Sequence, residues 1–191
     1  MSVMFLVFIM IFAFYVDLTD KMVEDRERKA LIKRAYTDEL TRLHNRRYCA
    51  EHMEKINTAG ERDYVVVCLD LNNLKTVNDT YGDMRGDVLI KSAADVISQT
   101  FSEQGVVGRM GGDEFVAIVQ HVDEAWMEEK IKEFAENIAG KNQEDRELHL
   151  SIAYGYAFGT ETGEKDIEKV YQIADNRMYE NKKAAKRAEN S

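Results

Sequence analysis

The sequence predicts an α+β domain: a ferredoxin-like or palm-type split βαβ sheet with flanking helices, preceded by a further helix. Three observations indicate this class. The run Tyr64–Leu69 is continuously apolar and rich in β-branched residues, as in a strand buried on both faces. Two extended segments flank Gly111-Gly112 and predict a β-hairpin. Stretches of helical periodicity separate these strands, giving the expected order strand, helix, hairpin, helix, strand, helix.

Residues 1–16, MSVMFLVFIMIFAFYV, are almost entirely apolar. This run is somewhat short of the roughly 20 residues that cross a bilayer. No basic region precedes it and no cleavage site follows it, so a signal peptide is disfavoured. We expect a transmembrane segment, either a complete anchor or the end of a longer span, in the inner (cytoplasmic) membrane. A buried core helix is the alternative.

Basic residues follow this segment closely, and by the positive-inside tendency they predict that the rest of the chain lies in the cytoplasm. They are Lys21, Arg26, Arg28, Lys29, Lys33 and Arg34. Residues 17–36 contain strong helix formers and no glycine, so we expect a helical stalk. Its apolar stripe is too thin for a self-sufficient coiled coil. A signalling helix and a solvated spacer both remain open.

The other elements follow from periodicity and from start and stop signals. Asp87 is expected to be the N-cap of a long helix, as well as a candidate ligand-binding residue. The expected helices are Asn45–Ile56, Asp87–Phe101, Glu124–Ala139 and Lys165–Arg187, and the expected strands beyond the first are Val106–Val107, Phe115–Val119 and Leu148–Phe158.

Composition excludes several classes of protein. With 45% hydrophobic and 32% charged residues, the chain has a globular balance and not a disordered one. The net charge of −9 argues against sequence-independent binding to nucleic acid, so no nucleic-acid partner is expected. A small ligand that carries phosphate stays compatible. Cys49 and Cys68 match no metal or redox motif and are expected to be buried thiols.

Acidic residues stand at two predicted strand ends. Asp70 ends the apolar strand, where a carboxylate must be paired, solvated or metal-bound. Asp113 and Glu114 follow the glycine pair. If the hairpin lies beside the first strand, Asp70 and Asp113 converge and describe a site for Mg²⁺ or Mn²⁺. Gly111 and Gly112 would permit a tight turn and close approach of a ligand. An ordinary hairpin tip is the alternative.

Two further groups suit a nucleotide. Asn78 and Asp87 could read guanine, because a carboxylate accepts from N1–H and the exocyclic amine while an amide donates and accepts. The last helix carries Lys182, Lys183 and Lys186, for which solvated charge near a helix C-terminus is the default interpretation.

The string Gly111-Gly112-Asp113-Glu114-Phe115 resembles the signature of the GGDEF family of diguanylate cyclases. Further segments resemble the family's other motifs in order and spacing, so residues 37–191 are expected to form a GGDEF domain. These segments are Asp38–Thr41 with Asn45–Arg47, Leu69–Lys75 with Asn78–Gly82 and Gly86-Asp87, and Ala174-Asp175 with Met178-Tyr179 and Lys182.

The resemblance implies that two GTP molecules are condensed into cyclic di-GMP with release of pyrophosphate, in a Mg²⁺-dependent homodimer formed through GGDEF domains. The stalk is a further candidate for a dimer contact. The resemblance also implies roles. The metal ligands would be Asp70, Asp113 and the backbone carbonyl of Leu71, with Glu114 as a further ligand or as the group that helps to deprotonate the 3′-hydroxyl. Substrate would contact Asn78, Asp87, Lys75, Gly111, Gly112, Lys182 and Lys186.

Some positions depart from the family pattern. Lys186 replaces a usual arginine, which gives a point charge in place of a planar fork. Asn72 stands where many members have a second aspartate. Ser102 and Gly105 replace the Arg and Asp of the product-inhibition site, so we expect little feedback inhibition there.

Three alternatives remain, of which the first and the third belong to other functional classes. The first is a catalytically silent GGDEF domain that binds GTP or a partner and regulates. The second is a related cyclase that accepts ATP, against which Asp87 argues because adenine N1 is itself an acceptor. The third is a structural output module whose stalk dimerises. Retention of the metal and signature residues favours activity.

Overall fold

The computed structural model describes residues 3–145, 147, 149–163 and 166–189 of the chain. The chain divides into two compact units between Tyr36 and Thr37. Helix α1 (Val3–Tyr36) belongs to the first unit and is 34 residues long. The apolar start and the charged stalk therefore form one continuous helix.

The prediction of a transmembrane segment at residues 1–16 is not supported. Within the described residues, no helix combines enough length and apolar character to cross a membrane. The expected membrane contact and inner-membrane location depended on this segment and are likewise unsupported.

The second unit is built on a five-stranded sheet with the strand order β1-β3-β4-β2-β5. The central strand β2 pairs antiparallel with β4 and β5, and β3 pairs antiparallel with β4 to form the predicted hairpin. All residues of β2 are buried, as predicted for this apolar run. The strands are β1 (His44–Asn45), β2 (Tyr64–Leu71), β3 (Gly105–Arg109), β4 (Glu114–Gln120) and β5 (Ile152–Phe158).

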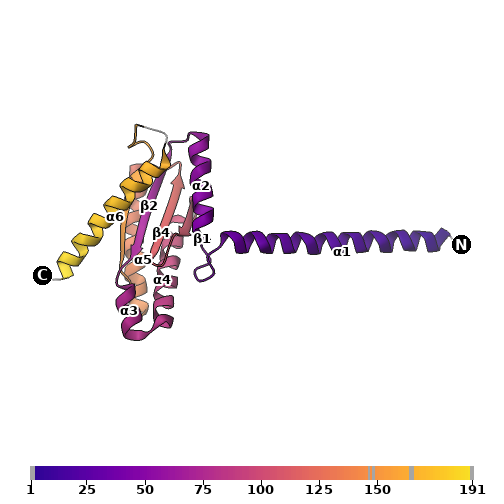
Figure 1. Ribbon diagram of the computed structural model, residues 1–191, viewed down its shortest axis with the longest axis horizontal. Helices are drawn as coiled ribbons and strands as arrows, with labels where there is room; N and C mark the ends of the chain where they lie inside the picture. The colour runs from indigo at the N-terminus through magenta and orange to yellow at the C-terminus, as the bar shows by residue number, and fades with distance from the viewer. Residues whose placement is uncertain (1–2, 146, 148, 164–165, 190–191) are drawn as a thin grey trace. The chain divides into compact units, whose positions relative to one another are not determined.

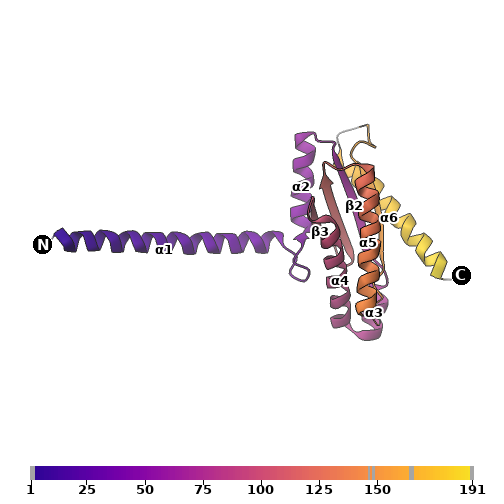
Figure 2. The same cartoon turned by 180° about the vertical axis from the view of Figure 1, so that it is seen from behind.

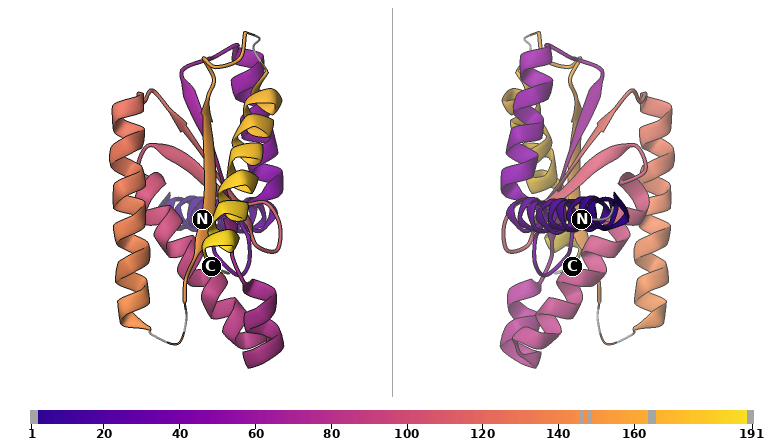
Figure 3. Two further views of the ribbon diagram at one scale, coloured as in Figure 1. Left: turned by 90° about the vertical axis from the view of Figure 1, so that its left-hand side faces the viewer. Right: turned by 90° about the vertical axis from the view of Figure 1, so that its right-hand side faces the viewer.

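Helices cover both faces of the sheet (Figures 1 and 2). One face is covered by α2 and α6 and the other by α4 and α5, while α3 lies at one end of the domain (Figure 3). The α+β class is confirmed, and the predicted elements occur in the predicted order, with β1 and α3 in addition to them. The helices are α2 (Arg46–Ala59), α3 (Leu74–Tyr81), α4 (Asp83–Phe101), α5 (Glu124–Glu144) and α6 (Ile167–Glu189).

The strand β2 contributes to two hydrophobic cores because successive side chains point to opposite faces. Val65 and Val67 belong to the core that includes residues of α4 and α5. Val66 and Cys68 belong to the core that includes residues of α2 and α6. By the same alternation, Asp70 lies on the face that α6 covers.

The sequence predicted the start of α2 closely but not the start of α4. A helix was expected from Asn45; α2 begins one residue later, and the Asn45 side chain caps it by accepting a hydrogen bond from the backbone N–H of Tyr48 at 3.1 Å. The expected start of the long helix at Asp87 is wrong: α4 begins at Asp83 after Gly82, so Asp87 is not an N-cap. The short helix α3 was not predicted. It has only eight residues, and its apolar side chains Leu74 and Val77 are only partly buried against the core, so it offers little periodicity to recognise in sequence.

Candidate functional site

Two carboxylates lie opposite each other at the end of the central strand. The register of β2 and β4 pairs Asp70 with Glu114. Directly opposite residues of an antiparallel pair share a face, with Cβ atoms about 4.5–5.5 Å apart. Asp70 is only 8% exposed, whereas Glu114 is exposed. The edge thus holds one anchored carboxylate and one that is open to ligands.

The tip of the hairpin is fixed to β2 through the backbone. The N–H of Leu71 donates to the carbonyl of Asp113 at 2.9 Å, and the N–H of Met110 donates to the carbonyl of Glu114 at 2.8 Å. The two acidic segments therefore lie side by side, as the sequence indicated. The cross-strand partner of Asp70 is, however, Glu114 and not Asp113, because the strand register pairs those positions.

The Arg109 side chain holds the glycine pair in position through hydrogen bonds to its backbone carbonyls. Its Nε donates to the carbonyl of Gly111 at 3.0 Å and its Nη2 to the carbonyl of Gly112 at 2.8 Å. Its Nη1 contacts Asp38 Oδ1 at 3.2 Å, and both side chains are largely buried, with 14% and 24% exposed. Sequence reasoning did not assign Arg109 or Asp38 to the site. No local pattern could have paired them, since they are 71 residues apart in the chain.

The carboxylate of Asp38 is held in its charged form. Burial raises its pKa, but hydrogen bonds from Thr41 and the charge and hydrogen bond of Arg109 outweigh this and lower the pKa below the ordinary value of 3.8. The Thr41 N–H and hydroxyl donate to Asp38 Oδ1 at 2.9 and 2.7 Å. An ionised Asp38 keeps Arg109 in place, so the segment Asp38–Thr41 positions the hairpin tip.

The chain reverses tightly between Arg109 and Glu114, as expected, but the glycine pair does not supply left-handed backbone for this turn. In the described residues, the glycines with positive φ are Gly60 and Gly82, not Gly111 and Gly112. A Cβ atom at Gly111 would lie 3.0 Å from Glu114 Oε2. The glycine therefore leaves room for the Glu114 carboxylate, and Gly112 has open space around it.

The three predicted phosphate-binding lysines lie in different surroundings. Lys182 of α6 places its Nζ 2.5 Å from Asp70 Oδ1, and so lies at the acidic edge. Lys75 is exposed in the first turn of α3. Lys186 lies in α6, but its side chain is outside the described residues.

The predicted guanine-reading residues lie on the neighbouring helices α3 and α4. Asn78 Oδ1 is buried and has no hydrogen-bond partner among the described residues. The backbone of Gly86 comes so close that a Cβ atom there would lie 1.8 Å from this oxygen. Asp87, the next residue of α4, is exposed. A nucleotide base that carries hydrogen-bond donors on its edge would satisfy both the buried Asn78 Oδ1 and the exposed Asp87 carboxylate.

The described part of the chain contains no group of three or more His, Cys, Asp or Glu side chains that could hold a metal. Mg²⁺ does not require such a cage, because it is usually bound by one or two carboxylates together with substrate phosphates and water. Asp70 and Glu114 provide hard oxygen donors on one face of the sheet and meet that requirement.

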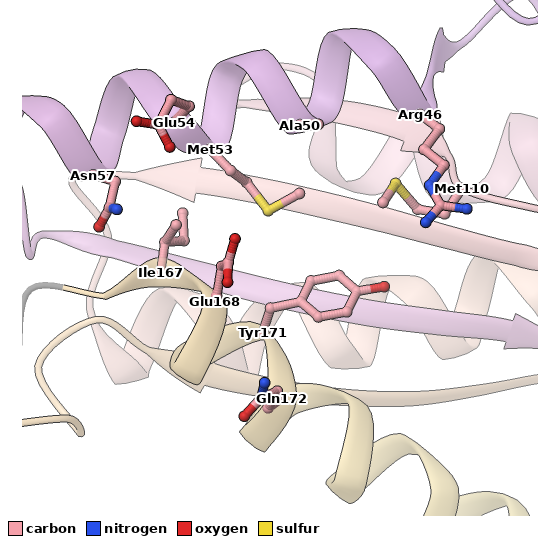
Figure 4. A pocket seen from close by; sticks show the side chains of 10 residues that line it. All are labelled: Arg46, Ala50, Met53, Glu54, Asn57, Met110, Ile167, Glu168, Tyr171 and Gln172. Carbon is pink, nitrogen blue, oxygen red and sulfur yellow. The ribbon is translucent and has the colours of Figure 1, made fainter.

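A groove of about 370 Å³ lies elsewhere, between α2 and α6 (Figure 4). Apolar side chains line it, with Met53 and Tyr171 in its middle, Arg46 and Met110 toward one end and Asn57 toward the other. None of the predicted site residues lines this groove. The candidate site is therefore an open edge of the sheet and not this cavity.

Fold and site together define the class of protein: an α+β domain with flanking helices and an acidic pair at the end of its central strand. The chain belongs to the GGDEF family, since the family model described as "Diguanylate cyclase, GGDEF domain" matches residues 35–188. The predicted family is confirmed.

Relatives agree with this assignment. The chain is 28% identical over 159 residues to the probable diguanylate cyclase DgcT of Escherichia coli, covering 80% of this chain and 34% of the relative. It is 29% identical over 172 residues to the diguanylate cyclase DgcS of Shewanella oneidensis, covering 86% and 55%. It thus spans about a third to a half of the length of these two relatives.

Solved structures agree in fold. The coiled coil and GGDEF domain of DgcB from Caulobacter crescentus, in complex with c-di-GMP, matches with a TM-score of 0.74 at 23% identity, covering 90% of this chain and 94% of that chain. At this identity the likeness shows the fold alone. A microbial GGDEF domain with c-di-GMP matches with a TM-score of 0.66 at 31% identity, covering 81% and 94%.

Proposed function

We propose that this chain is a diguanylate cyclase, which condenses two GTP into one cyclic di-GMP and two pyrophosphates, and that residues 37–191 are its catalytic domain. One observation carries the proposal: Asp70 and Glu114 pair across β2 and β4, at an edge that Lys182 also reaches, in a chain of the GGDEF family. Two similar proteins are named as diguanylate cyclases, one of them as a probable one.

The guanine of each GTP would bind between α3 and α4. Asn78 Oδ1, which has no partner among the described residues, would accept from the exocyclic amine. The exposed Asp87 carboxylate would accept from N1–H, which adenine does not carry. This pairing favours GTP over ATP. Lys182, Lys186 and Lys75 would contact the phosphates, close to Gly111 and Gly112.

Each condensation step forms one bond and breaks one. The 3′-hydroxyl of one GTP loses its proton, its oxygen bonds to the α-phosphorus of the other GTP, and the bond to the β-phosphate breaks to release pyrophosphate. The same step in the opposite direction closes the ring. Glu114 would help to remove the 3′-proton or act as a metal ligand; its exposed position opposite Asp70 supports either role.

The residues present fit a divalent cation. Asp70, Asp113, Glu114 and the carbonyl of Leu71 would hold Mg²⁺, or Mn²⁺ in its place. The bound metal would polarise the α-phosphate and stabilise the departing charge. These four protein groups would determine where the metal and the phosphates meet, because backbone hydrogen bonds join β2 to the hairpin tip.

A homodimer is part of the proposal, because one domain presents one nucleotide and the reaction needs two. Holding the two nucleotides face to face would supply the proximity on which the rate depends. The helix α1 offers a second contact between copies, since its apolar residues Leu18, Met22, Leu31 and Ile32 are exposed in the single chain.

Feedback inhibition through the family's usual site is not expected. Ser102 and Gly105 stand at its two key positions. A Cβ atom at Gly105 would lie 2.7 Å from the carbonyl oxygen of Ile118, so an aspartate could not be accommodated there without a backbone shift. Tight noncompetitive inhibition by cyclic di-GMP that changes near Ser102 abolish would contradict this.

The test is to incubate the purified chain with GTP and Mg²⁺ at low and high protein concentration and to identify the products by mass. Formation of cyclic di-GMP with a more than proportional rise in rate would support both the chemistry and its dependence on dimerisation. Binding of GTP without product at every concentration would favour a regulatory module that has lost catalysis. Product from ATP at a comparable rate would favour the related cyclase.

A further inference from the structure

We propose that Lys182 is the resident counter-ion of Asp70 and that a metal must displace it, so that metal entry and capture of phosphate by Lys182 are one exchange. This inference rests on the proposed function, because it deepens the roles of two residues of the same site. It concerns how the site passes from its nucleotide-free form to its loaded form.

The first support is the ion pair itself. Lys182 Nζ lies 2.5 Å from Asp70 Oδ1, and the two side chains are 25% and 11% exposed. A carboxylate this deeply buried is costly unless it is paired and hydrogen-bonded. The cation of Lys182 therefore meets a requirement of the nucleotide-free fold that a bound metal ion would otherwise meet.

The second support is that the fold places Lys182 there. Val170, Ala174 and Met178 are buried against the sheet and recur every fourth residue, and Lys182 is the next position in this series. Helix α6 lies close on β5 because Gly155 has no side chain: a Cβ atom there would lie 2.2 Å from the N of Met178. The packing of α6 against β5 therefore fixes the position of the Lys182 backbone.

The third support is electrostatic. A divalent cation at Asp70 would repel the ammonium group of Lys182 at the distance seen here, so binding of the metal weakens this ion pair. The flexible four-carbon stem of Lys182 can swing its charge onto a phosphate. The phosphates of a nucleotide would accept hydrogen bonds from the ammonium group of Lys182 and would also ligate the metal. Nucleotide and metal should therefore bind with positive coupling, equal in both directions.

The test measures Mn²⁺ binding without nucleotide, through the electron paramagnetic resonance signal of free Mn²⁺. Lys182→Met should bind Mn²⁺ about tenfold more tightly than the unchanged chain, within the usual range of coupling between sites. Lys182→Arg keeps the cation and should remain near the unchanged chain. Lys183→Met is the matched control, because Lys183 is the next residue and pairs with Glu180 at 2.9 Å. Asp70→Asn should lose the binding and so identifies the site.

A second arm adds a GTP analogue with a methylene group between the α- and β-phosphates. The unchanged chain should gain Mn²⁺ affinity with the analogue, and Lys182→Met should gain clearly less. Circular dichroism checks that each variant is folded.

Equal Mn²⁺ affinities for Lys182→Met and the unchanged chain, with loss in Asp70→Asn, would overturn the exchange. So would the absence of Asp70-dependent Mn²⁺ binding in every variant. Neither result depends on turnover, so failure of the proposed cyclase activity would be seen separately, as absence of cyclic di-GMP.

Discussion

The acidic edge and the base-binding end of the proposed site are built differently. At the acidic edge, Asp70 belongs to a strand whose residues are all buried, and backbone hydrogen bonds join that strand to the hairpin tip. At the base-binding end, Asn78 belongs to α3, which has no buried residue and follows Asn73 in the left-handed region at φ 61°.

This difference indicates that the two parts of the proposed site have separate roles. The strands fix the acidic edge because one register pairs Asp70 with Glu114, and two buried cores determine that register. The base-binding end depends on a contact between two helices and retains an unused acceptor, Asn78 Oδ1. We infer that chemistry is performed by the preformed part, and that ligand binding completes the other part.

The largest effect is expected at the acidic edge. Glu114→Ala should lower the turnover number by at least about 10²–10³-fold, since it removes the exposed member of the pair. Its melting temperature should hardly change because Glu114 is not buried. Turnover measured by cyclic di-GMP formation tests this. Glu114→Gln, the isosteric control, should also be inactive but keep part of the GTP binding. Full activity in either variant would refute the role.

The next effect concerns the support of the edge. Arg109→Met should lower the free energy of unfolding by about 1–3 kcal/mol and turnover by up to about 10²-fold, because it removes the hydrogen bonds to the carbonyls of Gly111 and Gly112. Denaturant melts and product assays measure the two quantities.

Arg47→Met is the control for this variant, because the Arg47–Glu51 pair is exposed on α2. It should change little. If Arg109→Met and Asp38→Asn have strictly additive effects on stability, the two side chains do not act as one unit.

A smaller effect is expected at the base-binding end. Gly86→Ala should weaken GTP binding roughly tenfold, because the new Cβ would lie 1.8 Å from Asn78 Oδ1 and must push that side chain aside. Titration calorimetry with a non-reacting GTP analogue measures this. Gly140→Ala in α5 has open space and should leave binding unchanged while adding helix propensity. Equal affinities of Gly86→Ala and Gly140→Ala for the GTP analogue would contradict a role of Asn78 in binding.

A change at Asp87 should alter the preference for GTP over ATP. Asp87→Ser removes the acceptor for guanine N1–H, and the preference for GTP over ATP should fall on the order of tenfold. Competition binding with both nucleotides measures the ratio. An unchanged preference would count against Asp87 as the residue that reads the base.

The smallest effect is a pH dependence. The pKa of Asp38 is lowered in the folded chain, so its ionisation adds stability that is present above the ordinary value of 3.8 and is lost as the pH falls through the lowered value. The stability difference between the unchanged chain and Asp38→Asn should therefore narrow below about pH 4. Urea melts between pH 3 and 7 would show this. A difference that widens toward acid would contradict the ionised Asp38.

Local pattern in the sequence determined much of this protein. The apolar run predicted β2, and the glycine pair between extended segments predicted the hairpin β3–β4. Asn45 marked the start of α2 through its capping side chain. These features could be predicted because a strand, a cap or a hairpin depends on residues that are neighbours in the chain. The signature motifs likewise identified the family and the candidate site residues.

Only the tertiary structure decided which of these residues meet. The register paired Asp70 with Glu114 in place of Asp113, and α6 brought Lys182 to Asp70 across 112 residues of sequence. Arg109 and Asp38, 71 residues apart, joined to support the hairpin tip. The physical reason is that periodicity reports which face of an element is buried, whereas pairing between distant elements is set by how their buried faces pack together.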